Sequence, residues 1–274
     1  MSFSEQMKHF IVTPFYVRRH FKGQVEPQLA APGWLDHRLR LFEDYCLPTV
    51  ISQSDQNFEW FIYFDESTPT EYLERIKSLT AQYKKISIKS CTLWEPGAIA
   101  KDIVAILPDG TKWIITTRLD NDDGLHRDFV STLHSAVRER REFLNFPRGI
   151  ILYSGKCFMY KHLSNAFLSL VEPAESPRTA CSVAHEQAAE VAPVRQLPEA
   201  PAFLQVVHGK NVSNKPRGTR IYARQALMGF EAIPVLQGLA KAETPLGIMF
   251  ENATTVMLWK TRDFLISLAK SIRR

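Results

Sequence analysis

One apolar segment that ends in a group of carboxylates constrains this chain more than any other. Trp113 to Leu119 is rich in β-branched and apolar residues, which predicts a buried strand. The next residues are Asp120-Asn121-Asp122-Asp123-Gly124. Three carboxylates this close repel one another unless a cation or solvent compensates. Hard divalent ions accept such oxygen ligands, often together with substrate phosphates, so the segment indicates metal-assisted chemistry on a phosphorylated substrate. The alternative is an ordinary turn, in which Asp, Asn and Gly are common.

The first half of the chain alternates between strand-like and helix-like apolar patterns. Strands are expected at His9–Tyr16, Phe58–Phe64, Ile86–Leu93 and Trp113–Leu119, and helices at Trp34–Val50, Thr68–Tyr83, Ile99–Leu107 and Arg127–Arg141. This alternation predicts an α/β fold with a mostly parallel, Rossmann-like central sheet flanked by helices. Ligands bind beyond the carboxyl ends of such strands. Asp65, which follows the second strand, is therefore expected at the same edge as the Asp120–Asp123 cluster.

The second half has a different pattern, with shorter strands and brief turns. The strand candidates are Gly149–Tyr153, Lys156–Tyr160, Phe167–Val171 and Phe203–Val207, and a Pro-rich segment spans 172–201. We expect a mixed α+β half followed by C-terminal helices.

Composition narrows the setting of the protein. No run of about eighteen apolar residues is present, so no membrane span is expected. The N-terminus has no secretory signal pattern, and the four cysteines are far apart, which favours a reducing cytoplasm. The net charge is +5, and the segment 252–274 is basic with interleaved apolar residues. That segment predicts either a helix at the inner, anionic face of a membrane or a helix docked on the core. No nucleic-acid-binding motif accompanies the charge, so no nucleic-acid partner is expected.

Four segments carry a resemblance to a known family. They are Phe10–Phe15, Phe58–Asp65, Arg118–Gly124 and Leu204–Asn214. With an Asp-x-Asp cluster at a strand end, the chain resembles the GT-A class of nucleotide-sugar glycosyltransferases. More closely, it is similar to the family called putative rhamnosyltransferases, enzymes of bacterial surface polysaccharides. The likeness covers roughly the first 220 residues.

The resemblance implies one GT-A-like domain over residues 1–274. About 8–148 would form a nucleotide-binding half, about 149–220 an acceptor and metal half, and about 221–274 the C-terminal helices. The implied activity moves a sugar, with rhamnose as the family label, from a nucleoside-diphosphate sugar to a glycan or lipid-linked glycan. The donor nucleotide, the sugar, the acceptor and the stereochemical outcome stay open.

The resemblance also implies roles for individual residues. Asp122 or Asp123, together with His208, would bind Mg²⁺ or Mn²⁺, while Asp120 would face the ribose or the sugar. Asp65 would contact the base. The other expected donor-binding residues are Thr13, Arg118, Lys210 and Lys215, and the cationic members of this set, with Arg217, suit phosphate oxygens.

The general base is not fixed by the resemblance. The acceptor hydroxyl must lose a proton, which calls for a carboxylate or a histidine. Glu172, Glu175 and Glu186 lie in the plausible region, and His185 with Glu186 forms an adjacent acid/base pair.

Three other functions compete with this interpretation. An EF-hand is excluded, because its sixth and twelfth positions would hold Leu125 and Ser131. A magnesium-dependent phosphohydrolase could use the same Asp cluster. A non-catalytic basic module that binds carbohydrate or membranes would not need the cluster at all.

Overall fold

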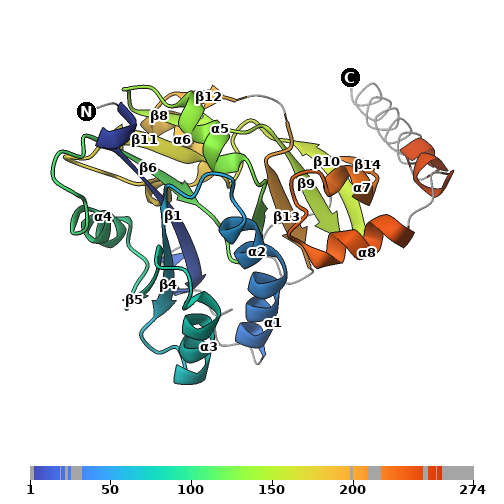
Figure 1. Cartoon of the computed structure of the whole chain (residues 1–274), viewed down its shortest axis with the longest axis horizontal. Helices are drawn as coiled ribbons and strands as arrows, with labels where there is room; N and C mark the ends of the chain where they lie inside the picture. Colours follow the sequence, from blue (N-terminus) through green and yellow to red (C-terminus); the bar gives the residue numbers. More distant parts are fainter. Residues whose placement is uncertain are drawn as a thin grey trace, which may run out of the picture.

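The structure is a computed structural model that describes residues 3–18, 20–21, 24–25, 33–197, 200–208, 217–242, 246–250 and 252–254 of the 274. Within this part of the chain, two β-sheets lie side by side, with helices packed around them (Figure 1). A small hairpin, β2 (His20–Phe21) and β3 (Gln24–Val25), stands apart.

The larger sheet has seven strands among the described residues, in the order β12-β8-β11-β6-β1-β4-β5. The strands β6, β1, β4 and β5 are parallel, β11 is antiparallel to both of its neighbours, and β12 is parallel to β8. Their bounds are β1 (Met7–Tyr16), β4 (Glu59–Asp65), β5 (Ile86–Cys91), β6 (Trp113–Arg118), β8 (Glu142–Asn145), β11 (Ser169–Pro173) and β12 (Val194–Gln196).

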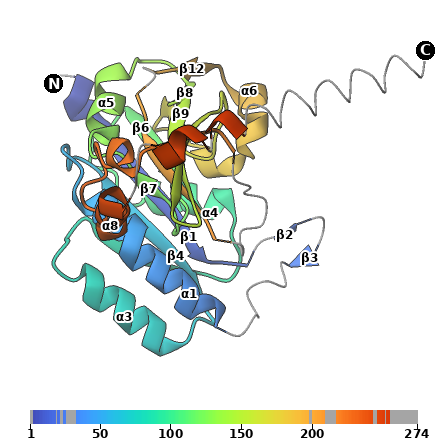
Figure 2. The ribbon, with the colours of Figure 1, turned by 90° about the vertical axis from the view of Figure 1, so that its right-hand side faces the viewer.

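Helices cover both faces of the parallel part, as expected for strands that are apolar at nearly every position. Ile11 of β1 packs on one face with residues of α1 (Trp34–Leu41), η3 (Phe42–Cys46), α2 (Leu47–Ile51), α3 (Thr70–Thr80) and α5 (Phe129–Ala136). Its neighbours Phe10 and Val12 face the other side, against α4 (Pro96–Val104). Figure 2 shows α1 and α3 side by side on the first of these faces.

The smaller sheet, within the part of the chain that the structure describes, has five strands in the order β14-β10-β9-β13-β7. They are β7 (Gly124–Leu125), β9 (Arg148–Tyr153), β10 (Lys156–Lys161), β13 (Phe203–Val207) and β14 (Thr219–Ile221). Its outer face packs on α7 (Ala223–Ala226) and α8 (Pro234–Ala242). The remaining short elements are η1 (Phe3–Gln6), η4 (Ala180–Ser182), η5 (His185–Gln187) and α6 (Ala188–Val191).

The predicted α/β class with a mostly parallel central sheet flanked by helices is confirmed, but some boundaries differ. The helix expected up to Arg141 ends at Ala136, and residues 142–145 form β8, whose buried Glu142 is bonded to Arg195. The helix beginning at Trp34 continues past Pro48, and a π-helical turn, η3, contains Asp44, whose carbonyl the proline ring would otherwise crowd.

The two expected halves are interleaved in space. The chain leaves the larger sheet at β6, enters the smaller one at β7, and returns to the larger one with β8, β11 and β12. The Asp120–Asp123 cluster is the first such crossing, and both sheets therefore contribute to its surroundings. None of the helices in the described ranges is long and apolar enough to cross a bilayer. The basic segment after residue 254 lies outside the described residues.

Candidate functional site

The Asp120–Asp123 cluster lies at the carboxyl end of β6, next to the end of β1. The chain proceeds from β1 to β4 on one side of β1 and reaches β6 on the other, so this edge is a topological switch point. Asn121 fixes the loop there, because its Nδ2 donates to the carbonyl oxygen of Phe15 at 3.1 Å.

Asp122 and Asp123 face different surroundings. Asp123 is buried, and its Oδ1 accepts a hydrogen bond from the backbone N–H of Val206 at 2.9 Å. Burial raises the pKa of Asp123 well above its usual range, and the nearby charges of Asp122 and Asp120 add to this. Asp123 thus ties β13 to the loop, and Asp122 is the carboxylate that meets His208.

Asp122 is the centre of a polar cluster drawn from both sheets and from α1. His208 Nε2, just after β13, lies 2.9 Å from Asp122 Oδ2. The guanidinium of Arg38 donates to both carboxylate oxygens, at 2.5 and 2.9 Å, and also to Asn121 Oδ1. His37 Nε2 lies 3.1 Å from His208 Nδ1.

Arg38 and His37 are site residues that the sequence analysis missed. Both belong to an ordinary amphipathic helix, α1, with no motif to mark them. Only the packing of α1 beside β1 brings them to Asp122.

Arg118 and Asp120 pair with each other at the open side of the cluster. Arg118 Nε and Nη2 donate to Asp120 Oδ1 at 3.1 and 2.9 Å. Their side chains are 26% and 32% exposed, so a ligand can reach both. Their expected contact with the donor stays a prediction.

Asp65 ends β4 at the same edge of the sheet, as expected from the sequence. Its carboxylate accepts hydrogen bonds from Arg18 Nε at 2.6 Å and from the backbone N–H of Ser67 at 2.9 Å. Burial by itself would raise the pKa of Asp65, but the bonds from Arg18 and Ser67 outweigh it and lower the pKa. Base recognition by Asp65 stays a prediction.

Of the other expected donor-binding residues, Thr13 is not brought to the site. Thr13 is fully buried, and its hydroxyl accepts a hydrogen bond from the indole of Trp60 at 2.9 Å, so it supports the core. Lys210 and Lys215 lie outside the described residues.

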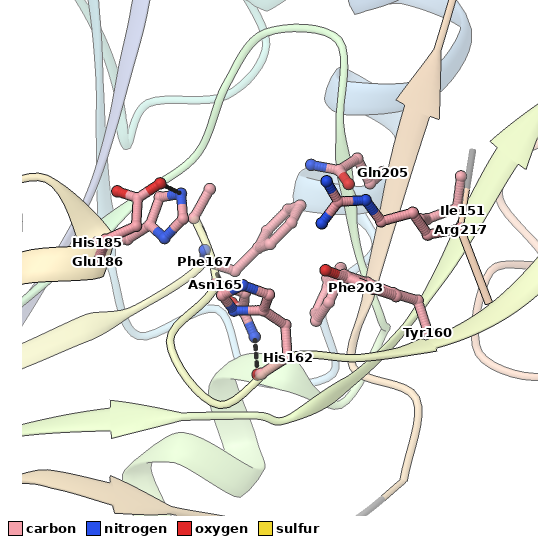
Figure 3. Close-up of a pocket in the computed structure, with 11 residues that line it drawn as sticks. Ile151, Tyr160, His162, Asn165, Phe167, His185, Glu186, Phe203, Gln205 and Arg217 are labelled. Carbon is pink, nitrogen blue, oxygen red and sulfur yellow. Dashed lines mark hydrogen bonds and ion pairs between the residues drawn. The ribbon is translucent and has the colours of Figure 1, made fainter. Parts of the chain in front are cut away.

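A cavity of about 220 Å³ lies between the smaller sheet and η5 (Figure 3). The rings of Phe167 and Phe203 are stacked with centroids 4.2 Å apart, and they form an aromatic wall. The lining also includes the polar residues Tyr160, His162, Asn165, His185, Glu186, Gln205 and Arg217. A smaller hollow, lined by Arg118, shares Ala166 and His185 with this cavity. The two hollows thus lead from the cavity to Arg118, which is paired with Asp120.

The structure places the candidates for the general base in different surroundings. His185 and Glu186 line the cavity, with His185 Nδ1 2.6 Å from the carbonyl oxygen of Ser164 and Nε2 3.2 Å from Glu186 Oε1. Glu172 does not fit the role of a base. It is fully buried opposite Ile114 near the start of β6, and its carboxylate accepts hydrogen bonds from the backbone N–H groups of Arg178 and Thr179.

Comparison with models of protein families shows the family to which the chain belongs. Residues 23–220 match the model of the family described as "Putative rhamnosyl transferase". The chain belongs to this family. The match includes β4, the Asp cluster, the cavity and His208. A search of curated proteins gave no match.

Some solved structures share a distant likeness. TarS 1-349 of S. aureus in complex with UDP-GlcNAc is 10% identical with a TM-score of 0.45, over 85% of this chain and 66% of that one. Without a ligand, TarS 1-349 is 10% identical with a TM-score of 0.43, and this chain spans 60% of its length. An inositol-1-phosphate CTP transferase of T. maritima is 8% identical with a TM-score of 0.37, over 87% of this chain and 98% of that one. These likenesses are too distant to bear on the site.

Proposed function

We propose that this protein is a divalent-cation-dependent glycosyltransferase that moves a hexose, rhamnose by its family, from a nucleoside-diphosphate sugar to a glycan or lipid-linked glycan. The observation that carries the proposal is the meeting of Asp122 and His208 at a switch point of the parallel sheet, beside a polar and aromatic cavity. Family membership supports the same class of reaction.

The side chains at Asp122 suit Mg²⁺ or Mn²⁺ if substrate phosphates complete the coordination of the ion. Among the described residues, no three His, Cys, Asp or Glu side chains are arranged to hold a metal. Asp122 and His208 supply two converging ligand atoms, and Mg²⁺ is commonly held by one or two carboxylates together with substrate phosphates. A cation bound there would offset the negative charge that develops on the departing diphosphate.

The other residues would position and deprotonate the substrates. Arg118 and Asp120, which are partly exposed, would contact the ribose or the sugar of the donor, and Asp65, at the neighbouring strand end, would contact the base. The cavity would receive the acceptor, whose hydroxyl groups could bond to the polar side chains that line it. Glu186, with His185 beside it, would take the proton of the attacking hydroxyl.

Donor binding tests the proposal directly. Calorimetric titration with a panel of nucleoside diphosphates should give binding that requires Mg²⁺ or Mn²⁺. Asp122→Asn should lose this binding, whereas Asp109→Asn, on an exposed loop after α4, should keep it. Binding that ignores the cation, or no binding to any nucleotide, would contradict the proposal.

Turnover then separates a transferase from a phosphohydrolase. Release of nucleoside diphosphate from a nucleotide sugar should rise when a glycan acceptor is added. Release of inorganic phosphate from simple phosphate esters would instead favour the hydrolase.

A further inference from the structure

The guanidinium of Arg38 lies where a cation at Asp122 would be expected. It donates to both oxygens of Asp122, at 2.9 and 2.5 Å, and its Nη1 is 3.3 Å from His208 Nε2. The Arg38 side chain is 14% exposed and that of Asp122 is 5% exposed, so solvent screens this pair only weakly.

This arrangement answers the electrostatic problem of the cluster. Three carboxylates within four residues destabilise one another. Arg118 neutralises Asp120, Val206 N–H supports Asp123, and Arg38 neutralises Asp122. The protein therefore carries its own counter-ion for the carboxylate that faces His208.

The guanidinium of Arg38 does not use all of its hydrogen-bond donors. Arg38 Nε is buried and has no hydrogen-bond partner among the described residues. A buried donor without a partner makes the arrangement less favourable than a complete one. A diphosphate, with several strong acceptor oxygens, would offer the guanidinium a better partner.

We propose that Arg38 is an internal counter-ion that competes with the divalent cation for Asp122, and that the anionic donor relieves this competition by drawing the guanidinium to its phosphates. The inference rests on the proposed function, since it concerns the same cation site. In the donor-free protein, two positive charges would have to share one carboxylate, so the cation alone binds weakly. Arg38 is in this sense a positioning residue that makes cation binding depend on the donor.

The test is titration of the full chain with Mn²⁺ alone, with free Mn²⁺ measured by electron paramagnetic resonance. Arg38→Gln should bind Mn²⁺ at least about tenfold more tightly than the wild type, because the competing charge is gone. Arg38→Lys keeps a charge but loses the two-point contact, so an intermediate affinity is expected. Arg75→Gln is the matched control, because Arg75 makes an exposed ion pair with Glu43 on the same side of the sheet, and it should leave the affinity unchanged.

Circular dichroism establishes which variants fold, and Arg38→Lys keeps the test decisive if Arg38→Gln does not. Equal or weaker Mn²⁺ binding in the folded Arg38 variants, including no binding in any of them, would overturn the inference. Titration of the wild type with a nucleoside diphosphate plus Mn²⁺ tests the proposed function separately. If Arg38→Gln binds Mn²⁺ more tightly but the wild type binds no nucleotide, the role of Arg38 as a counter-ion is supported. The proposed transferase function is then rejected.

Discussion

At the scale of single residues, the adjacent residues Asp122 and Asp123 make different contacts. Asp122 is paired with Arg38 and His208, whereas Asp123 is buried against the backbone of β13. The amide oxygen of an asparagine can replace the carboxylate in accepting a backbone N–H. It cannot replace the charge that Arg38 requires.

The two carboxylates should therefore respond differently to the same substitution. Asp122→Asn should lower the free energy of unfolding at pH 7 by about 3 kcal/mol, because it leaves the buried guanidinium of Arg38 without its charged partner. Asp123→Asn should change it by less than about 1 kcal/mol or stabilise the protein, because the raised pKa of Asp123 shows that its charged form is unfavourable in the fold. Urea denaturation of both variants checks this, and equal losses would contradict it.

His9 is a buried histidine that makes stability depend on pH. It lies in β1, with Nδ1 3.0 Å from His134 Nε2 and Nε2 2.8 Å from Thr117 Oγ1. Burial lowers the pKa of His9 well below 6.5, and the proximity of His134 lowers it further.

A histidine whose pKa is lowered by folding binds more protons in the unfolded chain between the folded pKa and 6.5. Stability is therefore lost as the pH falls below about 6.5, by up to about 1.4 kcal/mol per pH unit. His9→Gln should lose less stability between pH 7 and pH 5 than the wild type does. His126 and His162 also have lowered pKa values and titrate in both proteins, so the difference between the two slopes isolates His9. Parallel slopes in urea melts would contradict the prediction.

At the scale of elements, β9 and β13 approach so closely that one position requires glycine. A Cβ on Gly149 of β9 would lie 2.1 Å from the ring of Phe203 in β13. Phe203 is almost fully buried and is stacked on Phe167, so the ring has little room to move.

Gly149→Ala should lower the free energy of unfolding by about 1–3 kcal/mol, because the added methyl group overpacks a filled site. Gly238→Ala in α8 is the control, since nothing lies within 4 Å of the added Cβ there. The control should gain about 0.5–1 kcal/mol from the higher helix propensity of alanine. Thermal unfolding of both variants measures the difference, and a Gly149→Ala variant as stable as the wild type would contradict the packing argument.

At the scale of the whole molecule, the two sheets share one hydrophobic core. Ile11 of β1, Leu125 of β7 and Phe203 of β13 belong to the same buried cluster. The proposed cation site also draws on both sheets, because Asp122 follows β6 and His208 follows β13. A ligand at this site should stabilise the described fold as one unit.

A nucleoside diphosphate with Mn²⁺ at about 100 times its dissociation constant should add about 2.7 kcal/mol to the free energy of unfolding. For a chain of this size that shift corresponds to roughly 5–10 °C in the midpoint of a single thermal transition. Calorimetry checks both the size and the number of transitions. Two transitions, of which only one moves with the ligand, would contradict a shared core.

Sequence alone determined the features of this protein that depend on local patterns. The period of apolar residues gave the strands and helices of the α/β sheet, and turn chemistry located Asp65 and the Asp120–Asp123 cluster at strand ends. Local patterns did not predict elements that depend on neighbouring strands. An example is β8, which depends on pairing with β11 and β12.

The tertiary structure decided the partners of these residues. Arg38 and His208 reach Asp122 across 84 and 86 residues of sequence, Glu172 is taken into the core, and the cavity forms between segments spread over residues 151–217. The reason is physical, because strand ends follow from local propensity, whereas charge pairing and cavity shape follow from which surfaces pack together.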